Sequence, residues 1–144
     1  MFSFGVKWLY MVFFGEYLVS FTAPGRVVIP KKIRELVKGD SFIVTKGFDF
    51  CLAGYDLADW ESRSKELISV SLLDKTDITK RRLLFSSTMH IEIDGQGRFV
   101  IPKLLLQFAQ LKDKVLIIGV GDHFELWNPE KWASYQSDQL KAES

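Results

Sequence analysis

The pattern of apolar and polar positions predicts alternating helices and strands in the first half of the chain. Residues 31–38 follow a proline and place apolar side chains at i, i+3 and i+4, which is the spacing of a short amphipathic helix. Two strands are expected next, at residues 42–45 and 50–55, with a glycine-containing turn between them. Asp56 then caps a further helix that runs through Trp60.

The same order of elements is predicted again in the second half. A helix is expected at residues 103–110, followed by strands at 115–118 and 124–127. Asn128 followed by Pro129 is a strong start signal for a last helix, because asparagine caps well and proline suits the first turn. The pattern thus predicts one series of elements used twice.

A six-residue phrase extends this repetition to single residues. The chain reads Gly-Arg-Val-Val-Ile-Pro from Gly25 and Gly-Arg-Phe-Val-Ile-Pro from Gly97, 72 residues later in a chain of 144. Trp60 and Trp132, both expected to anchor the core, have the same separation. In each phrase a glycine able to take positive φ precedes an arginine, a short apolar strand and a proline that suits the start of a helix. Two related units in tandem are therefore predicted.

Each unit alone has too few apolar residues to close a core, so the two units are expected to pack on each other. The predicted fold class is α+β, with two βαβ-like hairpin repeats at residues 11–73 and 88–144. The repeats are expected to exchange strands across a pseudo-two-fold axis and to form one small β-barrel with flanking helices. Residues 74–87 are expected to form a connecting helix, and residues 1–10 an N-terminal extension, with Met11 as an alternative start to the first methionine.

Composition is that of an ordinary soluble globular domain, with 47% hydrophobic and 26% charged residues and a net charge of +1. The distribution of charge is more informative than its sum. Residues 22–46 carry six basic and two acidic residues, and residues 75–103 carry six basic and three acidic residues. Both copies of the phrase therefore lie in basic segments. Residues 113–144 carry six acidic residues against three basic ones. The single cysteine, Cys51, excludes an internal disulfide and fits a reducing cytoplasm.

No signature of catalysis or metal binding is present in the sequence. The chain lacks a glycine-rich phosphate loop, a nucleophile elbow and metal-ligand spacing. His90 and His123 are expected at ordinary strand or turn positions, and Cys51 among apolar strand residues as a buried thiol. We therefore expect neither an enzyme nor a bound metal or cofactor.

Several motifs taken together resemble the bacterial MraZ family. They are the duplicated Gly-Arg phrase, Phe14-Gly15-Glu16-Tyr17, Asp94-Gly95-Gln96-Gly97-Arg98, and the stretch from Ile117-Ile118-Gly119-Val120-Gly121-Asp122 to Trp127. The resemblance covers nearly the whole chain from Met11. It implies a swapped-hairpin fold of the AbrB class, closed ring-shaped homo-oligomers and transcription control through short direct repeats in double-stranded DNA upstream of the division and cell-wall gene cluster. It also implies a cytoplasmic protein associated with the nucleoid, without a membrane or small-molecule substrate as partner.

The family motif is an aspartate four residues before an arginine that contacts DNA. The second copy matches it in full with Asp94 and Arg98, whereas the first has Thr22 four residues before Arg26. Thr22 is expected to orient its loop by hydrogen bonding a backbone amide, while Arg26 loses its ionic partner. The residues expected to orient the two loops are Thr22, Gly25, Asp94 and Gly97.

The chemistry of arginine supports the same assignment independently. A guanidinium group pairs bidentately with guanine O6 and N7 or clamps a phosphate, and a rigid loop holds it at little entropic cost. We expect Arg26 and Arg98 to contact bases or phosphates, with Arg26 the stronger contributor, and Lys31, Lys32 and Lys103 to contact phosphates that set the register. The alternative is that the two arginines are structural and close a salt bridge or cap a carbonyl.

Three further alternatives stay open. The run Lys80-Arg81-Arg82 is either a solvated helix face or part of the DNA surface. The helix after the first phrase is charged and is expected to face solvent or DNA, whereas Leu104 and Leu106 in its counterpart are expected to help form a subunit contact. The alternative function is a protein-interaction module of similar fold, either antitoxin-like or a scaffolding ring.

Overall fold

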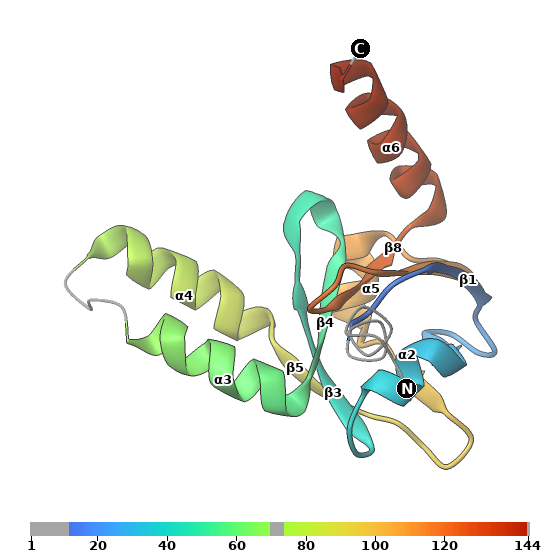
Figure 1. Ribbon diagram of the computed structural model, residues 1–144, viewed down its shortest axis with the longest axis horizontal. Coiled ribbons are helices and arrows are strands. Elements are labelled where there is room, and N and C mark those ends of the chain that lie inside the picture. The colour runs from blue at the N-terminus through green and yellow to red at the C-terminus, as the bar shows by residue number, and fades with distance from the viewer. Residues whose placement is uncertain (1–11, 70–73, 144) are drawn as a thin grey trace, which may run out of the picture.

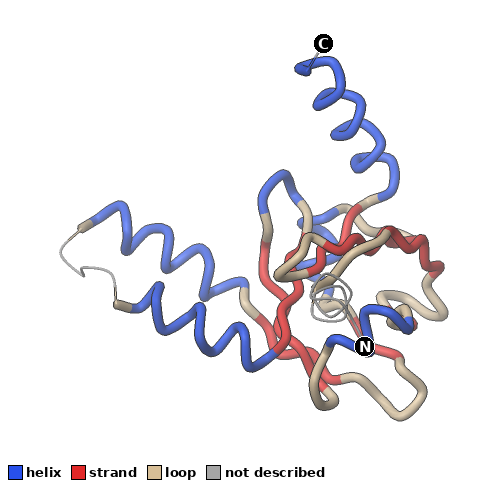
Figure 2. Tube along the Cα trace, viewed as in Figure 1, coloured by secondary structure: helices blue, strands red, loops and turns tan. Residues whose placement is uncertain are grey.

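The computed structural model describes residues 12–69 and 74–143, so the expected N-terminal extension at residues 1–10 lies outside the described residues. Strands and helices from both halves of the chain form a mixed α+β fold, the class that the sequence predicts (Figures 1 and 2). The strands are β1 (Glu16–Ser20), β2 (Arg26–Val28), β3 (Ser41–Lys46), β4 (Leu52–Asp56), β5 (Met89–Glu92), β6 (Arg98–Val100), β7 (Lys114–Gly119) and β8 (Phe124–Trp127). The helices are α2 (Lys31–Leu36), α3 (Leu57–Ile68), α4 (Lys75–Ser87), α5 (Lys103–Ala109) and α6 (Pro129–Glu143), with a short 3-10 turn η1 (Phe48–Phe50).

The sheet is built from both halves of the chain. Six strands are hydrogen-bonded in the order β1-β7-β8-β4-β3-β5, and β2 pairs with β6 in a separate two-stranded ribbon. Every one of these pairs is antiparallel. Strand β1 of the first half pairs with β7 of the second, and β5 of the second half pairs with β3 of the first. The ribbon lies against both edges of the sheet, with β2 touching β1 and β6 touching β5.

The pairing registers reveal where the two repeats meet. Val27 pairs with Phe99 in the ribbon, and Ala53 pairs with Glu125 in the sheet. Both pairs join residues 72 positions apart, so each joins equivalent residues of the two repeats. A pseudo-two-fold relation between the repeats therefore passes through these two pairs.

The larger of two hydrophobic clusters in the described structure is shared by both repeats, as the sequence predicts. Its members come from the ribbon, the sheet and helices α2 and α5, including Val27, Ile33, Phe99 and Leu105. The Phe42 ring packs edge-on against the Phe99 ring with the centroids 5.0 Å apart. This contact fixes the ribbon on the sheet, because one ring comes from each.

Two parts of the molecule extend away from this core (Figure 1). The α3–α4 hairpin leaves one side of the sheet, and α6 leaves another. Neither α3 nor α6 has a fully buried residue. The prediction that Trp60 and Trp132 anchor the core is confirmed in part for Trp132, which is half-buried and packs against a second, smaller hydrophobic cluster that includes Trp127. It is wrong for Trp60, which is half-buried against Tyr55 and belongs to neither cluster.

Element boundaries agree with the prediction to within about two residues. The helix expected at residues 31–38 ends earlier, since Val37 already has extended backbone. The strand expected from residue 50 begins at Leu52, because Asp49 and Phe50 take left-handed backbone with φ of 59° and 63°. The predicted cap of α6 is confirmed, since Asn128 Oδ1 accepts the amides of Glu130 and Lys131.

Candidate nucleic-acid interface

The β2–β6 ribbon places Arg26 and Arg98 on the same face. The central pair of the ribbon, Val27 and Phe99, is buried in the core, so the flanking arginines lie on the opposite face because side chains alternate along a strand. The antiparallel register makes the two arginines diagonal neighbours, with Cα atoms roughly 7–8 Å apart. The sequence predicts both arginines as separate contacts, and the structure joins them into one feature.

Asp94 holds the second arginine loop at three points. Its Oδ1 accepts the backbone amides of Gln96 and Arg98, each at 2.9 Å. Its Oδ2 accepts the Arg98 Nε at 2.8 Å, in an ion pair whose side chains are 35% and 43% exposed. These hydrogen bonds from Arg98 hold the pKa of the Asp94 carboxyl below its usual value, so the pair is charged at neutral pH.

The first arginine loop also has a glycine with positive φ, but its hydrogen bonds differ from those of the second loop. The Arg26 amide donates to the Ala23 carbonyl at 2.9 Å instead of to a side chain. The Thr22 hydroxyl donates to the Arg26 carbonyl at 3.5 Å, whereas the sequence suggests that it accepts a backbone amide. A hydroxyl is shorter than a carboxylate and carries a proton to donate, which accounts for the difference. Arg26 is exposed and makes no ion pair with any described residue.

A glycine with left-handed backbone sets the bend of each loop. Gly25 has φ +72° and Gly97 has φ +75°, values that L side chains adopt at a cost. The Gly25 carbonyl accepts the Ile101 amide and the Gly97 carbonyl accepts the Ile29 amide, both at 2.8 Å. Each loop is thus hydrogen-bonded to the strand end of the other repeat, so the two loops hold each other in place.

An open groove runs beside the ribbon, and both arginines line it. Ten residues line it, from the first loop, strand β5, the second loop and strand β6: Arg26, His90, Ile91, Glu92, Ile93, Asp94, Arg98, Phe99, Val100 and Pro102. The predicted lysines stand elsewhere. Lys31, Lys32 and Lys103 are exposed in the first turns of α2 and α5 and do not line the groove.

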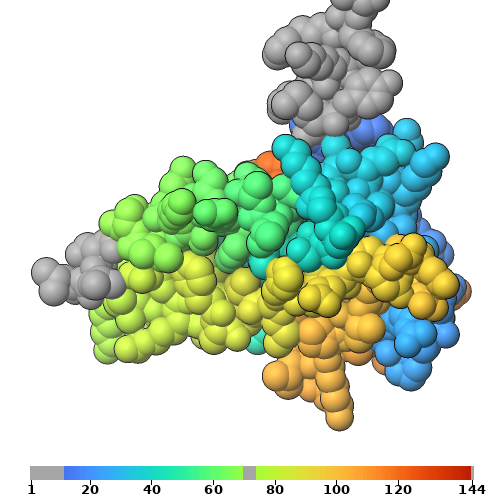
Figure 3. Space-filling view, turned by 90° about the horizontal axis from the view of Figure 1, so that it is seen from below, coloured from blue at the N-terminus to red at the C-terminus, as the bar shows by residue number. Residues whose placement is uncertain are grey.

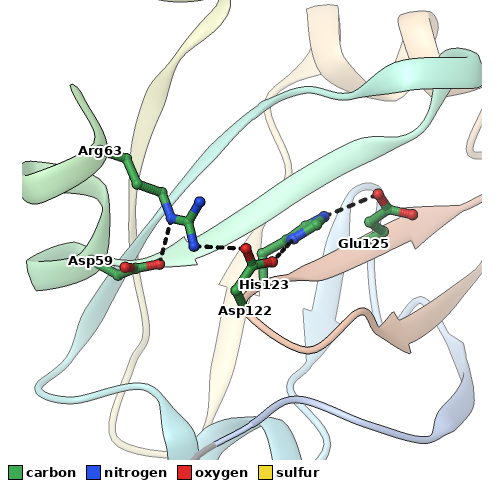
Figure 4. A network of polar contacts seen from close by, with 5 residues as sticks. All are labelled: Asp59, Arg63, Asp122, His123 and Glu125. Atoms are coloured by element: carbon green, nitrogen blue, oxygen red, sulfur yellow. Dashed lines mark hydrogen bonds and ion pairs between the residues drawn. The ribbon is translucent and has the colours of Figure 1, made fainter. Parts of the chain in front are cut away.

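The sequence alone predicts no role for a second polar cluster, which is shown in Figure 4. Arg63 of α3 donates from Nε to Asp59 at 2.9 Å and from a terminal nitrogen to Asp122 at 2.7 Å. The His123 ring lies between Asp122 at 2.6 Å and Glu125 at 3.1 Å. Residues 125 and 127 lie on one face of β8 and residue 123 directly precedes that strand, and this alternation is the sequence signal for the cluster.

The charges of this cluster stabilise one another. Burial lowers the pKa of His123, but its hydrogen bonds to Glu125 and Asp122 outweigh burial and raise that pKa above the ordinary value. Burial raises the pKa of Glu125, but the hydrogen bonds from His123 and Trp127 outweigh it and lower that pKa. The cluster ties α3 to the turn before β8 and to β8 itself.

Cys51 is buried beside this cluster, as the sequence predicts, and is 1% exposed. Burial, with a contribution from Glu125, raises the pKa of its thiol far above the usual value, so the group is an inert neutral thiol. No cluster of His, Cys, Asp or Glu in the described part of the chain is placed to hold a metal ion. None of the helices within residues 12–69 and 74–143 has the length and apolar content needed to span a bilayer.

These features define a tandem-repeat α+β protein in which two halves share one core and present paired arginine loops on one ribbon. The family described as "MraZ protein, putative antitoxin-like" matches the chain twice, at residues 12–83 and 84–144. The chain therefore belongs to the MraZ family, which confirms the resemblance seen in its motifs.

Individual relatives cover most of the chain. A protein named "Transcriptional regulator MraZ" from Acetivibrio thermocellus is 42% identical over 134 residues, or 92% of this chain and 93% of that protein. Proteins of the same name from Limosilactobacillus fermentum and Lactiplantibacillus plantarum are 40% and 37% identical, over 91% and 88% of this chain and 95% and 89% of their own lengths. The similarity thus extends over both repeats.

Proposed function

We propose that this protein is a sequence-specific DNA-binding transcription regulator that contacts DNA through Arg26 and Arg98. The observation that carries the proposal is the pairing of β2 with β6, which sets both arginines on one exposed face beside one groove. A two-stranded ribbon fits the major groove of DNA, where an arginine pairs bidentately with guanine. The names of the relatives support the proposal, since each is called a transcriptional regulator.

The other site residues take supporting roles in this proposal. Lys31, Lys32 and Lys103, exposed in the first turns of the helices that follow the ribbon strands, contact phosphates and set the register. Thr22, Gly25, Asp94 and Gly97 orient the two loops. Arg26 contributes more than Arg98 because it has no ion pair within the described chain to give up.

The finer assembly is also part of the proposal. The exchanged pairs β1–β7 and β5–β3, with the ribbon against both sheet edges, support a swapped-hairpin barrel of the AbrB class. The family resemblance supports a closed ring-shaped homo-oligomer in the cytoplasm, acting at the nucleoid on short direct repeats upstream of the division and cell-wall gene cluster. A ring raises the effective concentration of each arginine ribbon at neighbouring repeats, so that individually weak contacts add up to tight binding.

Selection of bound duplexes from a random pool, followed by anisotropy titrations on the winning site, tests the proposal. Arg26→Ala and Arg98→Ala should weaken binding by about 1–3 kcal/mol for each lost bidentate contact. Lys65→Ala is the matched control, since Lys65 lies on α3 and pairs with Glu61. Binding that ignores both arginine substitutions would refute the assignment. Salt-insensitive binding to a protein, with no DNA binding, would favour the protein-interaction alternative, because phosphate contacts weaken steeply with salt.

A further inference from the structure

Helix α4 is fixed to the groove that holds the two arginines. Only Thr88 separates the end of α4 from β5, and His90 of β5 already lines the groove. The Thr45 hydroxyl lies 3.3 Å from that of Ser87 and 3.1 Å from that of Thr88, and Thr88 also donates to the Leu84 carbonyl at 2.8 Å. These hydrogen bonds attach the last turn of α4 to strand β3, so the helix keeps a set direction relative to the groove.

The positive charges of α4 are unneutralised, in contrast to those of α3. On α3, Arg63 pairs with Asp59 and Asp122, and Lys65 pairs with Glu61. On α4, Lys80 and Arg82 are exposed and form no ion pair with any described residue.

The arginine between them lies differently. Arg81 is half-buried, and its Nη1 is enclosed without a hydrogen-bond partner in the described structure. An enclosed nitrogen is out of reach of an external phosphate, so the available charges of this run are those of Lys80 and Arg82. Helix α4 therefore carries positive charges that no acidic residue of the described structure pairs with.

The helix also lies on the same face as the candidate interface. Figure 3 shows α4 in yellow-green, the segment from β5 to β6 in yellow and α5 in orange on one side of the molecule. A helix of this length extends for about 20 Å, which is the length of roughly six base pairs of duplex. The surface from the groove to α4 is thus long enough to follow a duplex beyond the bases at the ribbon.

We infer that α4 extends the DNA interface, with Lys80 and Arg82 contacting backbone phosphates that flank the segment read by Arg26 and Arg98. The inference rests on the proposed DNA-binding function and assigns it a second element. Phosphate is the partner that fits, because Lys80 and Arg82 are positive and exposed and form no ion pair with a described residue, and because flexible cations on a helix supply register without base specificity.

Salt titrations of single variants test this inference. Affinity for the selected site is measured with about ten extra base pairs on each side, for the unaltered chain, Lys80→Ala, Arg82→Ala and the control Lys65→Ala. Each α4 variant should make the slope of log K against log salt shallower by about 0.9, the value of one phosphate contact. The control should leave the slope unchanged, and the preferred sequence should be the same for all four proteins.

A trimmed duplex locates the contact. When the flanking base pairs are removed, Lys80→Ala and Arg82→Ala should bind as the unaltered chain does. Slopes that equal that of the unaltered chain on the long duplex, while Arg26→Ala still weakens binding, overturn the α4 contact and leave the proposed function standing. If the unaltered chain binds no DNA, or binds it independently of both ribbon arginines, the proposed function has failed and the α4 contact with it. Far-ultraviolet circular dichroism checks that the variants are folded, which their exposed positions favour.

Discussion

Asp94 and Arg98 form an ion pair with 2.8 Å between Oδ2 and Nε, and the equivalent pair is missing from the other repeat, where Thr22 stands before Arg26. The two loops share the glycine with left-handed backbone but differ at the three positions before it, and the ion pair depends on the first of these, Thr22 or Asp94. The consequence is a fixed arginine and a free one on the same ribbon.

We predict that Arg26→Ala weakens DNA binding more than Arg98→Ala does. Arg98 must give up or share Asp94 when it contacts DNA, so the loss of that exposed ion pair offsets part of what its contact contributes to binding. Anisotropy titrations at low salt should show a small difference in affinity between the two variants. It should narrow in the Asp94→Thr background, where both loops carry threonine. A larger loss for Arg98→Ala than for Arg26→Ala would contradict the prediction.

The loop glycines should be needed for stability, and a third glycine supplies the control. Alanine at Gly97 takes a left-handed backbone at a cost of roughly 1–2 kcal/mol. Gly25→Ala should cost more, because its Cβ would also stand 3.0 Å from the Ile101 carbonyl oxygen and 3.1 Å from a Leu106 methyl group. Gly95→Ala should be close to neutral, since nothing lies within 4 Å of its Cβ. Urea unfolding of the three variants measures the order, and equal losses at all three would exclude this explanation.

Stability should fall as the pH rises through the folded-state pKa of His123. That pKa is raised by Glu125 and Asp122, so the protonated ring stabilises the fold fully below the unfolded pKa of about 6.5, and the stabilisation is lost above the folded value. The other polar groups around the ring are Arg63, which pairs with Asp122, and Tyr55, stacked on it at 5.1 Å. Burial also raises the pKa of Tyr55, so its hydroxyl stays neutral at the pH values where His123 loses its proton.

Urea unfolding from pH 5.5 to 9 measures this effect. His123→Gln keeps a hydrogen-bonding side chain and should make the free energy of unfolding depend less on pH over this range. Hydrogen exchange in α3 should show the same dependence, because Arg63 links that helix to Asp122. A His123→Gln protein with the pH profile of the unaltered chain would assign the dependence to another group.

The exposed leucine of α5 should support contacts between copies of the chain. Leu104 is 69% exposed, whereas Leu106 is partly buried against the core beside Gly25. Leu104 is therefore the more accessible of the two leucines expected at the subunit contact. Leu104→Lys should lower the mass measured by light scattering, and Leu140→Lys, 67% exposed on α6, should not. An unchanged mass for Leu104→Lys would remove α5 from the interface.

Much of the fold follows from short-range patterns in the sequence. The i, i+3, i+4 spacing predicts α2, and Asn128-Pro129 predicts the start of α6. The repeated phrase indicates that the two halves of the chain are equivalent. Local pattern does not reveal that β2 pairs with β6, since that contact spans half the chain and depends on both repeats closing one core. The sequence therefore does not show that Arg26 and Arg98 share one face, although it singles out each arginine as a candidate DNA contact.

The His123 cluster was missed for a related reason. Its members come from α3 and from the region around β8, and they lie about 60 residues apart in the chain, as Arg63 and Asp122 show. Their equivalents in the other repeat carry different side chains, so the repetition that guided the rest of the prediction gave no signal here. The regular spacing of Trp60 and Trp132 reflects equivalent positions on helices α3 and α6, and it does not distinguish Trp132, which packs on a buried cluster, from Trp60, which does not.

The pseudo-two-fold relation that pairs Val27 with Phe99 has a consequence for the proposed contact with DNA. In a dimer of identical chains, any substitution in one loop appears in the other as well, and the two sides of the contact stay alike. Here both sides belong to one polypeptide, so position 22 changes without position 94. The two ends of the ribbon accordingly differ, and under the proposed DNA binding a bound chain would distinguish the two directions along the duplex.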